Sequence, residues 1–324
     1  VLFLFNNKKK NILIFMSILV LFFVNYIFGS YKINERNTTN NSTTNSKKEY
    51  IDVKVVSANF DLEYNLSSKD IELLISNLIK YSDPDKDKKT LFVWPEGVFT
   101  GYNYEQIIKF KSLFKNNFSE NHLILFGINT IDKIDYKTFN SLLVVNNKLD
   151  KIYQYKKKKL VPFGEFLPFE KMFNNFGLKK ITQGYGSFSK GDKQKNFLFN
   201  GFNILPLICY EIIFPELIQE NKKNNLIVNI SEDAWFGGSI GPQQHFAKAI
   251  FRAVENNTYL VRSANQGISA FINNKGQIIK RLEPREKGNI ELRIPLVVNN
   301  DNKNKNDLIF FILLFTYTLI FFTL

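Results

Sequence analysis

Short apolar segments alternate with amphipathic segments between residues 50 and 295, and this alternation limits the possible folds more than any other feature of the chain. The predicted strands lie near residues 51–60, 91–95, 122–128, 139–145, 203–208, 225–230, 259–263 and 268–272. The predicted helices cover residues 68–81, 103–116, 211–221 and 242–256. Alternating strands and helices are typical of sheets covered by helices, so the sequence predicts a layered α/β domain.

Long apolar runs stand at both ends of the chain. Residues 12–28 and 308–324 carry no charged side chain, and each run is long enough to cross about 30 Å of hydrocarbon with slight thinning. A cleavable signal peptide is the competing interpretation of the first run. However, residues 26–31 are too bulky for a small-x-small cleavage pattern. We therefore expect a membrane anchor at each end.

These runs divide the chain into six predicted regions. The regions are a cytoplasmic end (1–10), a transmembrane helix (11–29), a flexible polar linker (30–49), a globular domain (50–295), a second linker (296–307) and a second transmembrane helix (308–324). Three lysines, residues 8–10, precede the first span, and by the positive-inside rule they hold the N-terminus in the cytoplasm. The globular domain is then expected on the outer face of the membrane.

The chain is strongly basic, with 43 lysine and arginine residues against 30 aspartate and glutamate residues and a net charge of +13. Anionic lipid headgroups attract basic side chains, so this excess suits a domain at a phospholipid surface. Nucleic acid is the other partner that such a charge suggests. We exclude nucleic acid because the domain is placed outside the cytoplasm and its lysines are scattered among asparagines.

Cys209 is the single cysteine of the chain, and it directly follows the apolar run 203–208. A lone buried cysteine commonly serves as a small apolar side chain. A thiol at the end of a strand is also well placed as a nucleophile, because α/β folds build their sites at the carboxyl ends of strands. Both interpretations stay open on Cys209 alone.

Two further segments supply what a nucleophilic thiol needs, namely a base for its proton and a cation for the oxyanion. Glu96 ends an apolar strand, and four lysines at residues 156–159 precede the stretch 160–165. Glu96 could equally be a solvated turn residue, and lysine runs are usually exposed faces. The stretch 160–165 is apolar and contains a proline and a glycine, which a purely solvated loop does not need.

The sequence predicts no metal site. His122 and His245 are far apart in the sequence and have no ligand spacing around them, so we interpret both as structural residues. The chemistry expected of this chain needs no metal and no other cofactor.

Several blocks of sequence carry a family resemblance. The blocks are Trp94-Pro95-Glu96, Tyr155 to Glu165, Ile208-Cys209-Tyr210-Glu211, Asp233-Ala234-Trp235-Phe236-Gly237, Ser239 to His245 and Asn265 to Ala270. Together they resemble the carbon–nitrogen hydrolase (nitrilase) superfamily, and within it the apolipoprotein N-acyltransferase branch. The resemblance covers roughly residues 50 to 295.

The resemblance implies a four-layer αββα sandwich and a catalytic triad. In that triad Glu96 is the general base, Lys157 the oxyanion-stabilising cation and Cys209 the nucleophile. The resemblance also implies three supporting residues and two substrate-binding aromatic residues, which are Glu165, Tyr210 and Glu211, and Trp235 and Phe236.

The triad leads to three expectations about charge. We expect Cys209 at a helix N-terminus, where the helix dipole and Lys157 favour the thiolate. The backbone N–H of Tyr210 is expected to donate a second hydrogen bond to the oxyanion. Glu96 and Glu165 carry like charges, so the pKa of one of them is expected to be raised.

The resemblance implies an acyltransferase of lipoprotein maturation. It would move an acyl chain from a phospholipid, through a thioester on Cys209, to the N-terminal diacylglyceryl-cysteine of an apolipoprotein. We expect a monomer in the bacterial inner membrane, with its catalytic domain on the periplasmic face. The alternatives are a membrane-tethered amidase that hydrolyses a small amide with the same triad, and a catalytically inactive scaffold.

The chain departs from the family pattern in three ways. Residues 57–61 resemble the family's opening strand motif only loosely. The family carries several membrane spans ahead of this domain, so we expect that most of this N-terminal bundle is missing from the sequence. Glu232 stands where the family pattern has an asparagine, which adds a carboxylate near Trp235.

Overall fold

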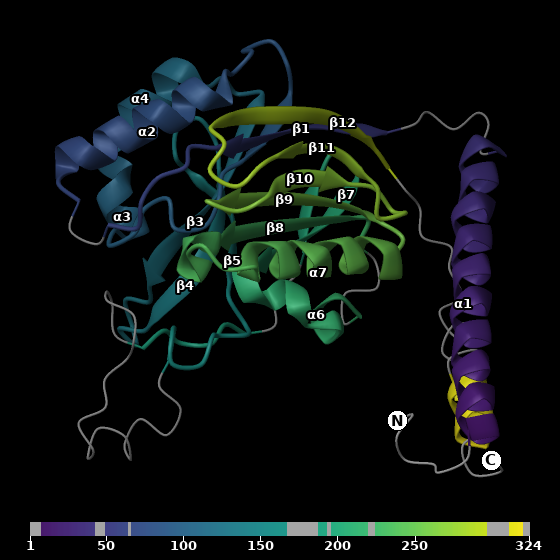
Figure 1. Ribbon diagram of the computed structural model, residues 1–324. Coiled ribbons are helices and arrows are strands. Elements are labelled where there is room, and N and C mark those ends of the chain that lie inside the picture. The colour runs from purple at the N-terminus through teal and green to yellow at the C-terminus, as the bar shows by residue number, and fades with distance from the viewer. Residues whose placement is uncertain are drawn as a thin grey trace, which may run out of the picture. The chain divides into compact units, whose positions relative to one another are not determined.

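The computed structural model describes residues 8–42, 49–63, 66–166, 187–192, 196–219, 224–296 and 311–319 (Figure 1). The chain separates into two units. One is Lys48–Asn299, and the other consists of Val1–Lys47 with Asn300–Leu324. The bounds of the unit Lys48–Asn299 are close to those of the globular domain expected at residues 50–295.

Within the described residues, the first sheet of this domain has six strands in the order β12-β1-β2-β3-β4-β5. Their bounds are β1 (Tyr50–Ser57), β2 (Thr90–Val93), β3 (His122–Ile131), β4 (Thr138–Val145), β5 (Lys151–Lys156) and β12 (Gly288–Pro295). The pairs β1–β2 and β2–β3 are parallel, and the other pairs are antiparallel.

The second sheet also has six strands in the described part of the chain, in the order β11-β10-β9-β8-β7-β6. Their bounds are β6 (Phe197–Phe199), β7 (Phe202–Ile208), β8 (Leu226–Glu232), β9 (Tyr259–Asn265), β10 (Ser269–Ile272) and β11 (Ile278–Leu282). The central strands β7, β8 and β9 are parallel, so their carboxyl ends meet at one edge.

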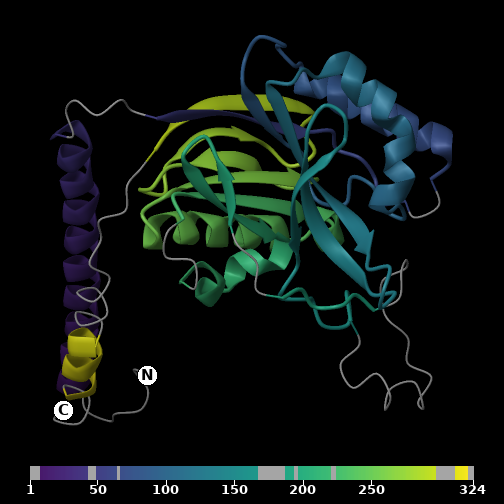
Figure 2. The ribbon, with the colours of Figure 1, turned by 180° about the vertical axis from the view of Figure 1, so that it is seen from behind.

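The two sheets pack face to face, and helices cover their outer faces (Figure 1, Figure 2). The helices on the first sheet are α2 (Ser68–Ser82), α3 (Tyr104–Ile107) and α4 (Lys111–Asn117), and those on the second are α6 (Pro215–Gln219) and α7 (Gly241–Glu255). The predicted αββα sandwich is confirmed.

The alternation of side chains along each strand explains the layers. On β2, Leu91 and Val93 belong to the core between the sheets, whereas Phe92 belongs to the core under the helices. Successive side chains of a strand point to opposite faces, so a strand that is apolar throughout can be buried on both. The apolar runs of the sequence therefore mark strands in the middle of the sandwich.

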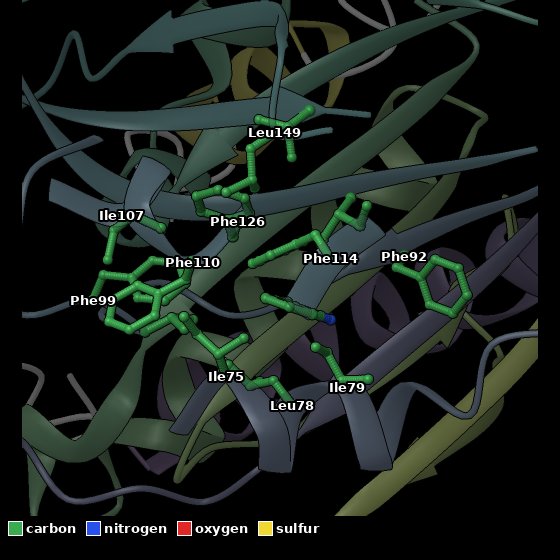
Figure 3. Packing of buried hydrophobic residues seen from close by; sticks show 14 of the residues in the cluster. Ile75, Leu78, Ile79, Phe92, Phe99, Ile107, Phe110, Phe114, Phe126 and Leu149 are labelled. Atoms are coloured by element: carbon green, nitrogen blue, oxygen red, sulfur yellow. The ribbon is translucent and has the colours of Figure 1, made fainter. Parts of the chain in front are cut away.

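Aromatic side chains fill the layer between the first sheet and its helices (Figure 3). Trp94 is fully buried, and its ring centroid lies 5.7 Å from that of Phe114 and 6.0 Å from that of Phe126. Its indole Nε1 donates a hydrogen bond of 2.9 Å to Oγ of Ser82. This contact ties the end of α2 to the strand that carries the residues before Glu96.

The helix predicted at 211–221 is interrupted, and residues 220 and 221 lie outside the described part of the chain. The chain forms the 3-10 helix η2 (Cys209–Ile213) and then α6, with Phe214 extended between them. Pro215 explains the break, because the residue before a proline is driven out of the helical conformation. Proline is in turn well suited to the first turn of the next helix.

Other elements also differ from the prediction. The predicted helix 103–116 consists of α3, the 3-10 helix η1 (Ile108–Phe110) and α4. The strands β5, β6, β11 and β12 were not predicted as separate strands. β11 is mostly exposed and β12 alternates charged with apolar residues, so neither stands out as an apolar run.

α1 (Lys8–Ser42) contains the segment Asn11–Tyr31, whose 21 residues are long and apolar enough to cross a membrane. A signal sequence near an N-terminus has the same length and composition. The helix continues through residues 30–42, which the sequence predicted as part of a flexible linker. Once a helix is nucleated, each further residue adds one hydrogen bond, and this carries α1 into the polar sequence.

Several predicted boundaries fall outside the described residues. Residues 311–319 are helical and lie within the second predicted transmembrane segment, 308–324. The rest of that segment, and residues 297–307 of the second linker, lie outside the described part of the chain. The same holds for residues 1–7 and 43–48.

Replacing Phe114 with alanine is expected to lower the free energy of unfolding by about 3–5 kcal/mol, because the side chain is fully buried and a cavity would remain. Leu73→Ala on α2 is the control. Leu73 is 62% exposed, and surface substitutions stay within about 0.5 kcal/mol. Denaturant titration followed by tryptophan fluorescence measures both changes, and equal effects would contradict the packing in Figure 3.

Candidate active site

Glu96, Lys157 and Cys209 line one cavity of about 400 Å³. Lys157 and Cys209 directly follow β5 and β7, and Glu96 lies in the turn after β2. The site therefore combines strand ends from both sheets. The structure brings together the three side chains that the sequence predicted as a triad.

Two carboxylates surround the ammonium group of Lys157, whose side chain is 1% exposed. Its Nζ lies 2.8 Å from Oε1 of Glu165 and 3.6 Å from Oε1 of Glu96. Burial alone would lower the pKa of Lys157, but the negative charges of Glu165 and Glu96 raise it above its ordinary value. Lys157 is thus held as a cation, which is the state that oxyanion stabilisation requires.

Asn140 on β4 joins the same two carboxylates. Its Nδ2 donates hydrogen bonds of 2.8 Å to Oε1 of Glu96 and 2.7 Å to Oε1 of Glu165. The backbone N–H of Val161 donates to Oε2 of Glu165 at 2.9 Å. Asn140 was not predicted, because one polar residue within an apolar strand has no distinguishing pattern.

The position of Lys157 decides the direction in which the pKa of Glu165 moves. Burial would raise the pKa of Glu165, but the charge of Lys157 and the donors Val161 and Asn140 together lower it below its ordinary value. Glu165 is therefore not the member of the pair whose pKa is raised. The cation between the two carboxylates outweighs their mutual repulsion at this residue.

Cys209 begins η2 with a φ of 50°, in the left-handed region. This conformation is unfavourable for a residue with a side chain, so surrounding contacts must hold it. Nε2 of His245 lies 3.1 Å from the carbonyl oxygen of Cys209, and the N–H of Ile208 donates to Oε2 of Glu211 at 2.9 Å. A sharp turn at a strand end presents the nucleophile at the edge of the sheet, as in a nucleophile elbow.

The resting Cys209 is a thiol. Burial raises its pKa to about 12, and the negative charge of Glu96 acts in the same direction. Lys157 lowers this pKa but does not outweigh them. The shift caused by Lys157 has the expected direction, but burial outweighs it. A base must take the proton as the sulfur attacks, and Glu96 lines the same cavity.

Glu211 connects the turn of Cys209 to the lysine segment of the other sheet. Its Oε1 accepts hydrogen bonds from the hydroxyl of Tyr155 at 3.0 Å and from the backbone N–H groups of Lys158 at 2.7 Å and Lys159 at 3.1 Å. Its Oε2 accepts the bond from Ile208. Burial raises the pKa of Glu211. This carboxyl group positions the two segments rather than acting as a base.

His245 on α7 belongs to a buried network of side chains that contacts the carbonyl oxygen of Cys209. Its Nδ1 lies 3.0 Å from Oδ1 of Asp233 and 3.1 Å from Nη2 of Arg262, which pairs with Asp233 at 2.9 Å. A carbonyl oxygen can only accept, so Nε2 carries the proton donated to Cys209. The structure gives His245 a specific role in holding the turn. His122, in contrast, packs against the aromatic rings of Phe92 and Phe118, far from the cavity lining.

The remaining predicted site residues also line the cavity. Tyr210 is partly buried there and packs edge-on against Phe214. Trp235 is 53% exposed and Phe236 is 37% exposed. Large, exposed aromatic side chains at a cavity suit contact with an apolar substrate. Within the described residues, no group of three or more histidine, cysteine, aspartate or glutamate side chains is arranged to hold a metal ion.

Two facing sheets with a carboxylate, an amine and a thiol in one cavity define a nitrilase-like protein. Residues 59–298 match the model of the carbon-nitrogen hydrolase family, and the chain belongs to this family. Solved structures share the fold. A mutant amidase from Nesterenkonia superposes with a TM-score of 0.54 at 14% identity, covering 77% of this chain and 92% of that chain. The C. elegans NitFhit protein gives 0.55 at 16% identity, covering 77% and 62%.

The curated relatives of the chain carry a more specific name than the family. An apolipoprotein N-acyltransferase of Rhizobium leguminosarum bv. trifolii is 36% identical over 216 residues, which are 64% of this chain and 40% of that protein. An apolipoprotein N-acyltransferase of Rickettsia typhi is 30% identical over 295 residues, which are 90% of this chain and 57% of that protein. The chain therefore spans about half the length of these relatives.

The raised pKa of Cys209 predicts slow alkylation at neutral pH. Because only the thiolate reacts, the rate of labelling by iodoacetamide should still be rising at pH about 10, well above the free-thiol value of about 8.5. Glu96→Gln removes a negative charge and should move the midpoint to lower pH. Lys157→Met removes a positive charge and should move it higher. A wild-type midpoint near 8.5 would contradict the burial of the thiol.

Loss of the Glu211 carboxyl group should weaken the link between the sheets. Glu211→Ala removes an acceptor that receives four hydrogen bonds, three of them from backbone N–H groups, and we expect the free energy of unfolding to fall by about 3 kcal/mol or more. Glu211→Gln keeps one acceptor oxygen and should cost less. Denaturant titration measures the order of stability. A Glu211→Ala protein as stable as the wild type would show that these contacts are not needed.

Proposed function

We propose that this chain transfers a fatty acyl group from a phospholipid to the α-amino group of a diacylglyceryl-cysteine at the N-terminus of an apolipoprotein. One observation carries the proposal. The thiol of Cys209, the carboxylate of Glu96 and the cation of Lys157 meet in one cavity, in a chain whose curated relatives are named apolipoprotein N-acyltransferase.

In the first step the sulfur of Cys209 attacks the ester carbonyl of the phospholipid. Glu96 takes the proton of the thiol, while Lys157 and the backbone N–H of Tyr210 stabilise the oxyanion. The carbon–oxygen bond of the ester then breaks. The leaving lysophospholipid oxygen receives the proton from Glu96, and the acyl group stays on Cys209 as a thioester.

In the second step the acceptor amine attacks the thioester carbonyl. Glu96 takes a proton from the amine as the carbon–nitrogen bond forms, and then gives it to the departing sulfur of Cys209. The products are an amide and the restored thiol. Water must be kept from the thioester, and the apolar side chains around the cavity, including Phe99 and Ile128, support this.

The proposed setting is the bacterial inner membrane. The apolar segment Asn11–Tyr31 and the lysines before it support an anchor with a cytoplasmic N-terminus, and the catalytic domain would then face the periplasm. All triad residues come from one chain, which supports a monomer. The exposed Trp235 and Phe236 suit contact with acyl chains.

Acyl transfer in phospholipid bilayers tests this function. The full chain is mixed with a diacylglyceryl-cysteine peptide, and the N-acylated peptide is followed by mass spectrometry. Cys209→Ala should abolish transfer, Glu96→Gln should slow it by about 10²–10⁴-fold, and Lys157→Ala by about 10²–10³-fold. Lys159→Ala, which alters the neighbouring lysine paired with Glu216, should retain activity.

Two results would contradict the proposal. Transfer by the Cys209→Ala variant would exclude the thioester. Hydrolysis of small amides by the wild type, with no transfer from any phospholipid, would identify a membrane-tethered amidase instead.

A further inference from the structure

Glu232 is a buried carboxyl group of the cavity that the two steps above do not use. It ends β8, is 3% exposed and lines the cavity together with Glu96 and Cys209. A Cβ added at Gly97 would lie 2.4 Å from its Oε2. Glycine at this position therefore leaves the space that Glu232 occupies beside the catalytic groups.

Only neutral groups hold the Glu232 side chain in the described structure. Nδ2 of Asn265 donates to both carboxyl oxygens, at 3.0 Å each. The backbone N–H of Ala234 donates to Oε1, also at 3.0 Å. These bonds fix the direction of the carboxyl group but do not balance a negative charge.

Two neighbouring buried carboxylates each have a cation. Glu165 pairs with Lys157, and Asp233 pairs with Arg262. Glu232 has no such ion pair among the residues that the structure describes. Buried charges in proteins are normally paired, so this carboxyl group lacks the partner that its neighbours have.

Further negative groups lie near Glu232, and they disfavour its ionised form. The backbone N–H of Glu232 donates to Oε2 of Glu96 at 3.1 Å, and Asp233 follows in the chain. Burial raises the pKa of Glu232 well above its ordinary value, and the charges of Glu96 and Asp233 raise it further. Lys157 and Cys209 line the same cavity, but Lys157 is already paired. A cationic ligand group beside Glu232 would supply the positive charge that its ionised form lacks.

We propose that Glu232 binds the protonated α-amino group of the acceptor and takes the proton that this group must lose before it attacks the thioester. This inference rests on the acyl-transfer reaction proposed above. An α-amino group has a pKa of about 7.7–8.0, so at neutral pH it arrives mostly as an ammonium, which has no lone pair for attack. Asparagine, which the family resemblance predicts at this position, could accept a hydrogen bond but not a proton.

The proton balance needs two acceptors. The ammonium displaces the proton of Glu232 to solvent as it binds, and an ion pair forms. It then gives its first proton to the Glu232 carboxylate and becomes the neutral amine. Glu96 takes the second proton as the carbon–nitrogen bond forms and passes it to the sulfur of Cys209. After the amide leaves, the carboxyl group of Glu232 is protonated again, as at the start.

The test compares two nucleophiles on the same preformed acyl-enzyme. The full chain in phospholipid bilayers is acylated, and discharge of the thioester is timed with a diacylglyceryl-cysteine peptide or with hydroxylamine, which is uncharged at neutral pH. Glu232→Gln keeps the shape of the neutral carboxyl group but cannot take the proton. Glu72→Gln, an exposed carboxylate on α2, is the matched control.

At pH about 6.5 the ratio of peptide to hydroxylamine discharge should fall about tenfold or more in Glu232→Gln and stay unchanged in Glu72→Gln. The fall should shrink to within about twofold at pH about 9.5, because the α-amine is then mostly neutral in solution. If Glu232 had a purely structural role, Glu232→Gln would slow discharge by both nucleophiles alike at every pH.

The outcomes separate this inference from the proposed function. If the wild type forms no thioester, the acyl-transfer proposal fails. If the thioester forms and Glu232→Gln discharges both nucleophiles in the wild-type ratio at pH about 6.5, the role of Glu232 is overturned while the acyl-transfer proposal stands.

Discussion

The ammonium of Lys157, buried between the carboxylates of Glu165 and Glu96, is the interaction on which the rest of the site depends. Removing one partner of a buried ion pair leaves an uncompensated charge and commonly costs about 3–5 kcal/mol. Asn140 bonds to both carboxylates, so the cation also fixes their spacing. A fixed cation in a mainly apolar cavity can stabilise developing negative charge without reorganising when the reaction occurs.

The nucleophile belongs to the other sheet, so the site works only if the two sheets stay in place. Glu211 provides this link, because it receives hydrogen bonds both from Ile208 before the nucleophile and from the lysine segment after β5. His245 also holds the turn, through the carbonyl oxygen of Cys209. The unfavourable left-handed turn of Cys209 is thus maintained by side chains, at a position where the thiol reaches the cavity.

Contiguous sequence motifs made the three triad residues predictable. Glu96 and Cys209 each follow an apolar run at the end of a strand, where α/β folds build their sites, and Lys157 stands in the block that resembles the family. Asn140 and the contact of His245 could not be predicted, because they join elements that are distant in the sequence. The protonation state of Cys209 could not be predicted, since it depends on burial that only the packed sheets determine.

The central claim is that Cys209 takes an acyl group from a phospholipid with the help of the Lys157 cation. Intact mass spectrometry of the full chain after incubation with phospholipid tests this claim most directly. The account predicts one added acyl group in the wild type, carried on Cys209, none in Cys209→Ala and much slower addition in Lys157→Met. An equal yield of adduct in Lys157→Met, or an adduct that persists in Cys209→Ala, would contradict the account.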